Sequence, residues 1–294
     1  MDILVYADWF GLKGAARMGT LSVTHIRGRE VFSFAYDKDW LNRGQAQRLD
    51  PDLQLFSGPQ YLAADKKNFG LFMDSSPDRW GQVIMKRREA IAARLEKRKE
   101  KTLFQEDFLL GVFDQQRMGA LRFKLSEEGT FLSDNADFAT PPWTSLRELE
   151  VASLQLEKET LPDRESLKWQ NMLLGPGASL GGARPKAGVA DETGSLWIAK
   201  FPAAGDRSDM GAWEMVANEL AADAGIDVAG GQAKRFNDKH HTYLSKRFDR
   251  IGTKRRLHFA SAMTLLGQRD GAEGLSYLDL AAFLIKHDAD PKRD

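Results

Sequence analysis

The feature that most constrains the fold of this chain is a run of small residues that leads directly into two short apolar segments. Residues 175–186 are rich in glycine, and a polar turn at 191–194 separates the segments 186–190 and 195–201. This order predicts a glycine-rich loop followed by a β-hairpin. Glycines let backbone N–H groups approach phosphate oxygens because no Cβ atom stands in the way. The loop is therefore a candidate for covering nucleotide phosphates, although turns use glycine as well.

Two charged residues after the loop suit the same chemistry. Lys200 ends the second strand, and Asp209 starts a predicted helix that runs to Ala224 and carries Glu214. A lysine can reach phosphates as a point charge, and a glutamate on the next helix can hold that lysine in place. This order is typical of the small lobe of a kinase-like fold. Two structural alternatives stay open: a solubilising lysine on an edge strand, and a solvated glutamate favoured by the helix dipole.

The residues after the loop exclude two other nucleotide-binding folds. No Gly-Lys-Ser/Thr stands at the offset of a P-loop, and the hairpin occupies the place of the helix that a Rossmann fingerprint requires. The chain has no cysteine and five histidines, which excludes thiolate metal sites. The adjacent His240 and His241 would diverge on a strand, so a metal-dependent hydrolase has little support. Lys and Arg number 42, as do Asp and Glu, which argues against a dedicated nucleic-acid binder.

The N-terminal part predicts a β-rich subdomain. Strands are expected at residues 3–6, 20–26, 30–36 and 119–125, and helices at 77–94, 104–112 and 145–156. Ser75 and Asp78 fit a capping box at the start of the 77–94 helix. The Asn, Asp and Pro residues at 135–142 indicate a boundary. We expect an N-terminal subdomain at 1–135, a nucleotide-binding lobe and hinge at 136–250, and the start of a helical lobe at 251–294.

The chain shows no sign of a membrane or secretory segment. The first residues carry acids and no basic region, so they do not form a signal peptide. No run approaches the ~18 apolar residues that a membrane helix needs. We therefore expect a cytoplasmic protein with no membrane partner.

These motifs, taken in order, resemble those of the HipA family of toxin kinases from bacterial type II toxin–antitoxin modules. The similar segments are 69–81 (FGLFMDSSPDRWG), 110–123, 179–186 (SLGGARPK), 198–202 (IAKFP), 213–221 and 245–250 (SKRFDR). They cover the chain broadly. The resemblance implies an α+β fold, in which an N-terminal β-rich subdomain precedes a protein-kinase-like (PI3/4-kinase-like) small lobe and the start of a helical large lobe.

The resemblance also implies a role for individual residues, with ATP and Mg²⁺ as cofactors. Lys200 would bind the α- and β-phosphates, and Glu214 would orient it. Ser179 matches the family's autophosphorylation site, unless it is a turn serine that bonds its own backbone. Lys246 stands where the family usually has glutamate. The residues implied in ATP binding are Gly181, Gly182, Ala183, Arg184 and Lys186 over the phosphates, and Lys246, Arg247 and Phe248 as hinge backbone groups for adenine.

The family's catalytic-loop segment has no counterpart here. Such a kinase needs an Asp for the substrate hydroxyl, an Asn a few residues on, and a second Asp for Mg²⁺. Asp270, Glu273, Asp279 and Asp288 have no asparagine at a suitable spacing, so we expect them on loops and helix surfaces. We therefore expect the Mg²⁺ ligands outside this chain and the 294 residues alone to be inactive. A fragment, a natural truncation and half of a split kinase stay open, and each predicts exposed apolar surface.

The resemblance implies a serine/threonine protein kinase toxin in its complete form. Its substrate would be a translation-related protein such as an aminoacyl-tRNA synthetase. Its partner would be a helix-turn-helix antitoxin of the HipB type, through which operator DNA is contacted. The alternative is a non-catalytic binding or regulatory module that docks an antitoxin or a separate catalytic chain.

Overall fold

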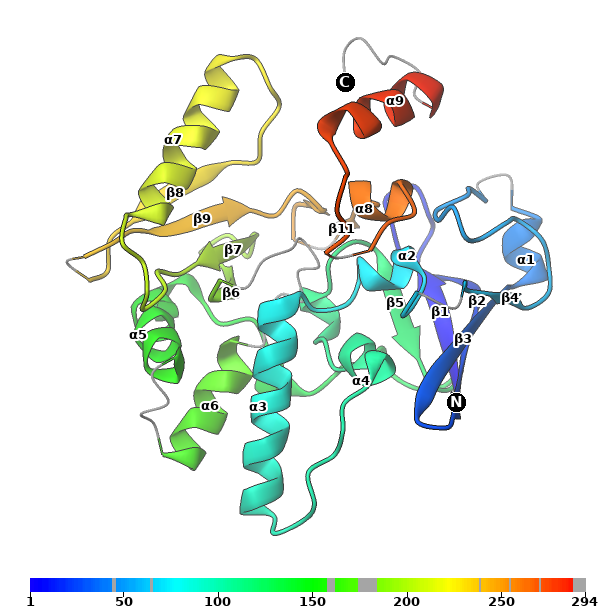
Figure 1. Ribbon diagram of the computed structural model, residues 1–294, viewed down its shortest axis with the longest axis horizontal. Helices are drawn as coiled ribbons and strands as arrows, with labels where there is room; N and C mark the ends of the chain where they lie inside the picture. Colours follow the sequence, from blue (N-terminus) through cyan, green and yellow to red (C-terminus); the bar gives the residue numbers. More distant parts are fainter. Residues whose placement is uncertain are drawn as a thin grey trace.

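Two antiparallel sheets with helices packed around them organise the computed structural model (Figure 1). The structure describes residues 1–43, 46–63, 66–157, 162–173, 184–237, 239–253, 255–269 and 271–287. The N-terminal sheet lies on the right of Figure 1 and the second sheet on the left. The expected α+β class is confirmed.

The N-terminal sheet has the strand order β4-β3-β2-β1-β5. Its strands are β1 (Asp2–Ala7), β2 (Ala16–Ile26), β3 (Arg29–Tyr36), β4 (Gln60–Tyr61) and β5 (Leu121–Lys124). The turn between β2 and β3 places Arg27 and Gly28 at φ 51° and 77°. Two consecutive positive φ values give the hairpin twist that matches the flanking strands. The expected strands at 3–6, 20–26, 30–36 and 119–125 are thus confirmed.

One face of this sheet forms the larger apolar core. Buried side chains of β2, β3 and β5 meet the short helices α1 (Lys38–Leu41) and α2 (Gly70–Met73) there. The core includes Met18, Phe34, Trp40, Phe72 and Phe123. The rings of Phe34 and Phe123 each contact that of Phe72 in an edge arrangement, so the aromatic side chains fix α2 against the sheet.

Two longer helices continue the N-terminal part, α3 (Arg79–Leu95) and α4 (Gln105–Leu110). The expected capping box is wrong in its detail, because Asp78 rather than Ser75 is the N-cap of α3. The Oδ1 atom of Asp78 accepts the N–H of Gly81 at 2.8 Å. Ser75 is buried one turn earlier. Aspartate is among the best N-cap residues because its carboxylate satisfies a free N–H group of the first turn.

The second sheet has the strand order β6-β7-β9-β8. Its strands are β6 (Lys186–Ala190), β7 (Leu196–Lys200), β8 (Gly231–Lys234) and β9 (Thr242–Lys246), with helix α7 (Met210–Asp223) between β7 and β8. Helices α5 (Leu146–Glu157) and α6 (Asp163–Leu173) cover one face. Helix α6 was not predicted from the sequence. It also packs against α3 and so joins the two parts of the molecule.

Short elements complete the described chain: the 3₁₀ turns Asp114–Gln116, Ala136–Phe138 and Trp143–Ser145, the hairpin β10 (Arg250–Ile251) and β11 (Arg255–Arg256), and helices α8 (Ala262–Leu265) and α9 (Tyr277–His287). Helix α9 stands apart from the two sheets in Figure 1. Tyr277 and Leu278 are 91% and 80% exposed there. In the described part of the chain, no helix has both the length and the apolar character to cross a bilayer.

A buried ionic cluster ties the segment after β9 to the N-terminal part. Asp249 is fully buried and accepts hydrogen bonds from Arg247, from Arg250 and from the N–H of Gly119 at 2.7 Å. Arg247 also donates to the carbonyl oxygens of Gln116 and Arg117 at 2.7 and 3.0 Å. Burial alone would raise the pKa of Asp249, but the charge and hydrogen bonds of Arg247 hold it below its usual value.

A second carboxylate cluster connects the β2–β3 hairpin with the start of α4. The side chain of Glu30 accepts the N–H groups of Gln105 and Glu106 at 2.9 and 3.1 Å. The Oε1 atom of Glu106 lies 2.8 Å from Nε2 of His25. Burial and the neighbouring Glu106 side chain raise the pKa of Glu30 to about 7.

This cluster predicts that Glu30 contributes to the stability of the folded chain at low pH and that this contribution is lost as the pH rises from about 5 to 8. The folded state binds the Glu30 proton more tightly than the unfolded state does. The protonated group therefore contributes fully to stability below the pKa of the unfolded state, and this contribution is lost as the pH rises through the folded pKa of about 7. Glutamine at position 30 keeps one of the two acceptor oxygens and removes the titration. Urea unfolding should therefore show a smaller fall in midpoint for Glu30→Gln than for the wild type. Equal falls would contradict the assignment.

Candidate nucleotide-binding site

The pair of Lys200 and Glu214 forms the centre of the candidate site. Lys200 is the last residue of β7, and its Nζ atom lies 2.6 Å from Oε2 of Glu214 on α7. The side chains are 36% and 30% exposed, so a ligand can reach the pair. The ring of Tyr243 lies below, with its centroid 5.5 Å from Nζ. β7 is an inner strand, which is at odds with the alternative of a solubilising lysine on an edge strand.

Strand register brings a second lysine to the same face of the sheet. Lys200 has two direct cross-strand partners, Lys186 on β6 and Tyr243 on β9. Direct partners point to one face of a sheet. The alternate residues Ala187, Ala199 and Leu244 point to the opposite face and join the core under α5. One face thus builds the core, and the other presents charged groups.

Lys186 has a partner that was not predicted from the sequence. Its ammonium group is buried and forms an ion pair with Oδ2 of Asp78, the N-cap of α3. Burial raises the pKa of Asp78 more than the attraction of Lys186 lowers it. Lys186, the last residue of the glycine-rich segment, is therefore attached to the N-terminal part, while its predicted contact with phosphates stays a prediction.

Replacing Asp78 by asparagine should destabilise the chain by about 3 kcal/mol, because a buried ammonium group loses its counter-charge. Asparagine is also a good N-cap, so helix capping changes little. Urea unfolding of Asp78→Asn measures the loss. The double variant Asp78→Asn/Lys186→Met removes the stranded charge and should recover most of it. A single variant as stable as the wild type would contradict the importance of the pair.

Arg184 is also engaged by a carboxylate. Its two terminal nitrogens donate to the two oxygens of Asp206 at 2.9 and 2.5 Å, a bidentate arrangement. Asp206 in turn accepts the N–H of Ala203 just after β7. Arg184 thereby fixes the end of the described loop segment to the chain that follows Lys200. Its contact with phosphates stays a prediction.

Three interactions hold the start of α7, and thereby Glu214, against β9. Asp209 caps the helix by accepting the N–H of Ala212, and it also binds His241 through the backbone N–H and through Nδ1 at 2.9 and 2.6 Å. Burial would raise the pKa of Asp209, but these hydrogen bonds lower it to about 2. A Cβ atom on Gly211 would lie 2.1 Å from the carbonyl oxygen of His241, so only glycine permits this approach.

The predicted hinge needs a correction. The backbone N–H of Lys246 donates to the carbonyl oxygen of Gly230 at 2.8 Å. The backbone N–H of Arg247 donates to the carbonyl oxygen of Leu196 at 3.0 Å. These two donors are used by the sheet and are not available to an adenine ring. The Arg247 side chain is fully buried in the Asp249 cluster. Phe248 is 47% exposed and contacts the ring of Phe259, and a role for its backbone stays a prediction.

Several predicted residues lie outside the described residues. They are Ser179, Gly181, Gly182 and Ala183 of the loop, together with Asp270 and Asp288. Among the residues that the structure describes, no three His, Asp or Glu side chains are grouped to hold a metal ion. The Mg²⁺ ligands that the resemblance implies therefore stay a prediction.

Comparison with known proteins places these features in a family. A family model of the HipA N-terminal domain matches residues 12–124, and one of the HipA-like C-terminal domain matches residues 178–294. The chain belongs to the HipA family. HipA from Shewanella oneidensis MR-1, solved in a complex with HipB and operator DNA, is similar in structure with a TM-score of 0.56 and 17% identity. The match covers 95% of this chain and 63% of the Shewanella chain. No curated protein matches by sequence.

Separation along the chain decides which residues of the candidate site could be predicted from the sequence. Lys200 and Glu214 stand in a recognisable order along the chain, and the structure brings them together. Asp78 and Asp206 carry no such signal, because a lone aspartate does not reveal a partner many residues away. Asp78 was visible only as a helix-start residue, so its ion pair with Lys186 could not be read from spacing.

Proposed function

We propose that this chain is the nucleotide-positioning part of a HipA-type serine/threonine protein kinase. The observation that carries the proposal is the contact of Lys200 with Glu214 on the open face of the second sheet. An ammonium group held there can neutralise the charge of a phosphate chain, and the carboxylate keeps it from folding away. ATP, when bound, would supply the phosphoryl group.

The protein part of the site would act by position and charge. Lys200 would donate to the α- and β-phosphates, and its 2.6 Å contact with Glu214 would restrict the rotation of the lysine side chain. Asp209 and His241 would keep α7 seated while the nucleotide enters. The phosphoryl acceptor would be a serine or threonine of a translation-related protein such as an aminoacyl-tRNA synthetase.

We propose a helix-turn-helix antitoxin of the HipB type as the partner. The support is the family membership and the Shewanella structure, in which HipA is assembled with HipB and operator DNA. A formal net charge of +0 is consistent with a protein that meets DNA mainly through that partner. Because this chain spans 63% of the Shewanella chain, the partner and the activity of the whole protein are both proposals.

Transfer of radiolabelled phosphate from ATP tests the proposed kinase. We expect no label when the 294 residues are used alone, and label on a serine of a protein substrate when a chain that also carries the family's catalytic-loop segment is used. Lys200→Met in that longer chain should abolish the label. Labelling by the short chain would contradict the assignment of catalytic residues elsewhere, and labelling by Lys200→Met would contradict the site.

Exposed apolar side chains favour a second candidate function, a docking module without catalysis. Trp213 and Leu220 on α7 are 63% and 62% exposed, and Tyr277 and Leu278 on α9 are more exposed still. Exposed apolar surface of this kind is typical of a site that a binding partner covers in a complex. A pull-down of the antitoxin with and without ATP separates the two candidates. If the antitoxin binds equally well with and without ATP, and the chain shows no affinity for the nucleotide, the docking module would be favoured.

A further inference from the structure

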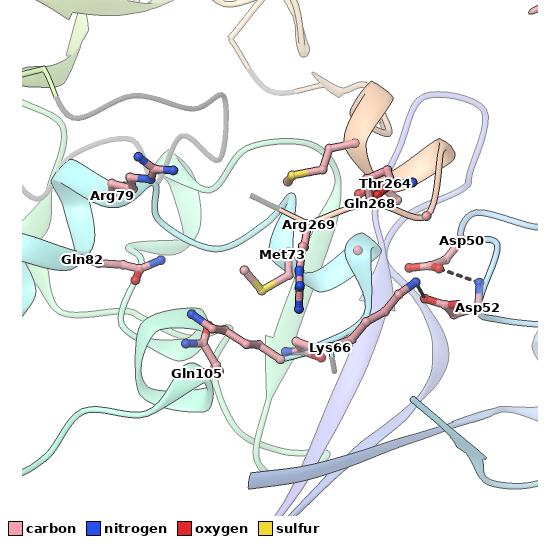
Figure 2. A pocket seen from close by; sticks show the side chains of 15 residues that line it. Asp50, Asp52, Lys66, Met73, Arg79, Gln82, Gln105, Thr264, Gln268 and Arg269 are labelled. Carbon is pink, nitrogen blue, oxygen red and sulfur yellow. Dashed lines mark hydrogen bonds and ion pairs between the residues drawn. The ribbon is translucent and has the colours of Figure 1, made fainter. Parts of the chain in front are cut away.

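A second cavity lies away from the Lys200 site, between the N-terminal part and the segment around α8. Its volume is about 320 Å³, which is of the size that holds a small metabolite. Figure 2 shows side chains from the 50–52 segment, α2, the start of α3 and residues 263–269 converging on it. A ligand bound here would contact chain segments about two hundred residues apart, before and after the predicted hinge.

Positive charge is in excess around this cavity. Among the residues that the structure describes, Lys66, Lys67, Arg79 and Arg269 line it, and the acidic residues in its wall are Asp50 and Asp52. Asp52 accepts a hydrogen bond from Lys66 at 2.5 Å. The two oxygens of Asp50 accept the N–H groups of Asp52 and Leu71, each at 2.8 Å. The described side chains of the wall thus carry four cations against two carboxylates, and this formal balance of charge favours an anion.

Asn68 gives the cavity wall a donor that needs an acceptor. Its side chain is 4% exposed, and its Oδ1 atom accepts the N–H of Phe69 at 2.8 Å. That bond fixes the orientation of the amide. Its Nδ2 atom is buried and has no hydrogen-bond partner among the described residues. Because a buried donor without an acceptor is costly, a ligand oxygen that reached this atom through a small movement of the wall would be favourable.

The rest of the wall suits the carbon part of a small molecule. Met73 and Met263 supply polarisable apolar surface. Helices α2 and α8 are packed closely here, because a Cβ atom on Gly70 would lie 2.6 Å from Oγ1 of Thr264. The cavity is therefore framed by a close contact between these two helices.

We propose that this cavity binds a small anionic metabolite that carries carboxylate or phosphate groups. Arginine recognises both groups through paired N–H donors, so the wall chemistry admits either. The Nδ2 atom of Asn68 would donate to one oxygen of the ligand, and Met73 and Met263 would contact its carbon atoms. The site does not depend on nucleotide binding at Lys200. A ligand here would join α3, whose cap holds Lys186, to the segment after the hinge.

Calorimetric titration with pyrophosphate and with citrate tests the site and separates the two ligand chemistries. Arg269→Gln and Asn68→Asp should each weaken binding of the preferred anion by at least about tenfold, the loss expected for one charge-assisted hydrogen bond. Asn68→Asp keeps the acceptor for Phe69 but replaces the donor. The exposed Lys13→Gln should bind as the wild type does, and the losses caused by Arg269→Gln and Asn68→Asp should persist in a Lys200→Met background, in which the nucleotide site is removed. No binding of either anion, or a loss confined to Lys200→Met, would overturn the proposal.

A second measurement on the wild type avoids the risk that a variant fails to fold. With ¹³C-labelled methionine methyl groups, the bound anion should shift the resonances of Met73 and Met263. The resonance of Met210, which is exposed on α7, should stay in place and serves as the internal control. Shifts at Met210 without shifts at Met73 and Met263 would place the anion elsewhere and overturn the proposal.

Discussion

Replacing Lys200 by methionine is expected to weaken ATP binding by about ten- to a hundredfold, because one charge-assisted hydrogen bond to the phosphates is lost. Methionine keeps the length and apolar stem of lysine, so the fold should persist. Glu214→Gln keeps a hydrogen-bonding oxygen near the ammonium group and should weaken binding less. Titration of a fluorescent ATP analogue in the presence of Mg²⁺ measures both effects.

The matched control is Lys234→Met. Lys234 belongs to β8 of the same sheet, and its Nζ atom lies 4.6 Å from the centroid of the Trp143 ring. This variant removes the same charge from another strand of the same sheet, separated from β7 by β9, and should leave the affinity unchanged. Equal losses in Lys200→Met and Lys234→Met would mean that ATP responds to general positive charge and not to the proposed site.

Removing the Asp249 carboxylate is expected to give the largest loss of stability. Asp249→Ala leaves the buried Arg247 and Arg250 guanidinium groups without their shared acceptor, and breaking a buried pair in this way costs about 3–5 kcal/mol. The N–H of Gly119 loses its acceptor as well. Urea denaturation followed by tryptophan fluorescence gives the change in the free energy of unfolding.

Asp163→Asn is the control for the Asp249 experiment. Asp163 also pairs with an arginine, Arg94, but both side chains lie largely in solvent. Solvent and salt screen such a pair, so its loss should change the unfolding midpoint little. If Asp249→Ala unfolds at the same urea concentration as Asp163→Asn, the buried cluster does not hold the two parts of the molecule together.

The local elements of the fold could be predicted because their signals lie within a few residues. Alternating apolar residues marked β2 and β3, and a glycine after residue 224 marked the end of α7, where Gly225 has a φ of 82°. The order of Lys200 and Glu214 could be read in the same way. Each of these features depends on spacing along one segment.

The contacts that join distant segments could not be predicted. Lys186 and Asp78 are separated by 108 positions, and nothing in either local sequence identifies the other as a partner. The Asp249 cluster likewise binds backbone groups near residue 117, which any sequence supplies. The hinge residues were assigned from resemblance alone, and the sheet register showed that two of their N–H groups are already used.

A crystal structure with a non-hydrolysable ATP analogue tests the central claim most directly. We expect the Nζ atom of Lys200 within hydrogen-bond distance of an α- or β-phosphate oxygen while its contact with Glu214 is kept. Density for the triphosphate on another face of the second sheet, with the Lys200 side chain turned towards solvent, would contradict the account.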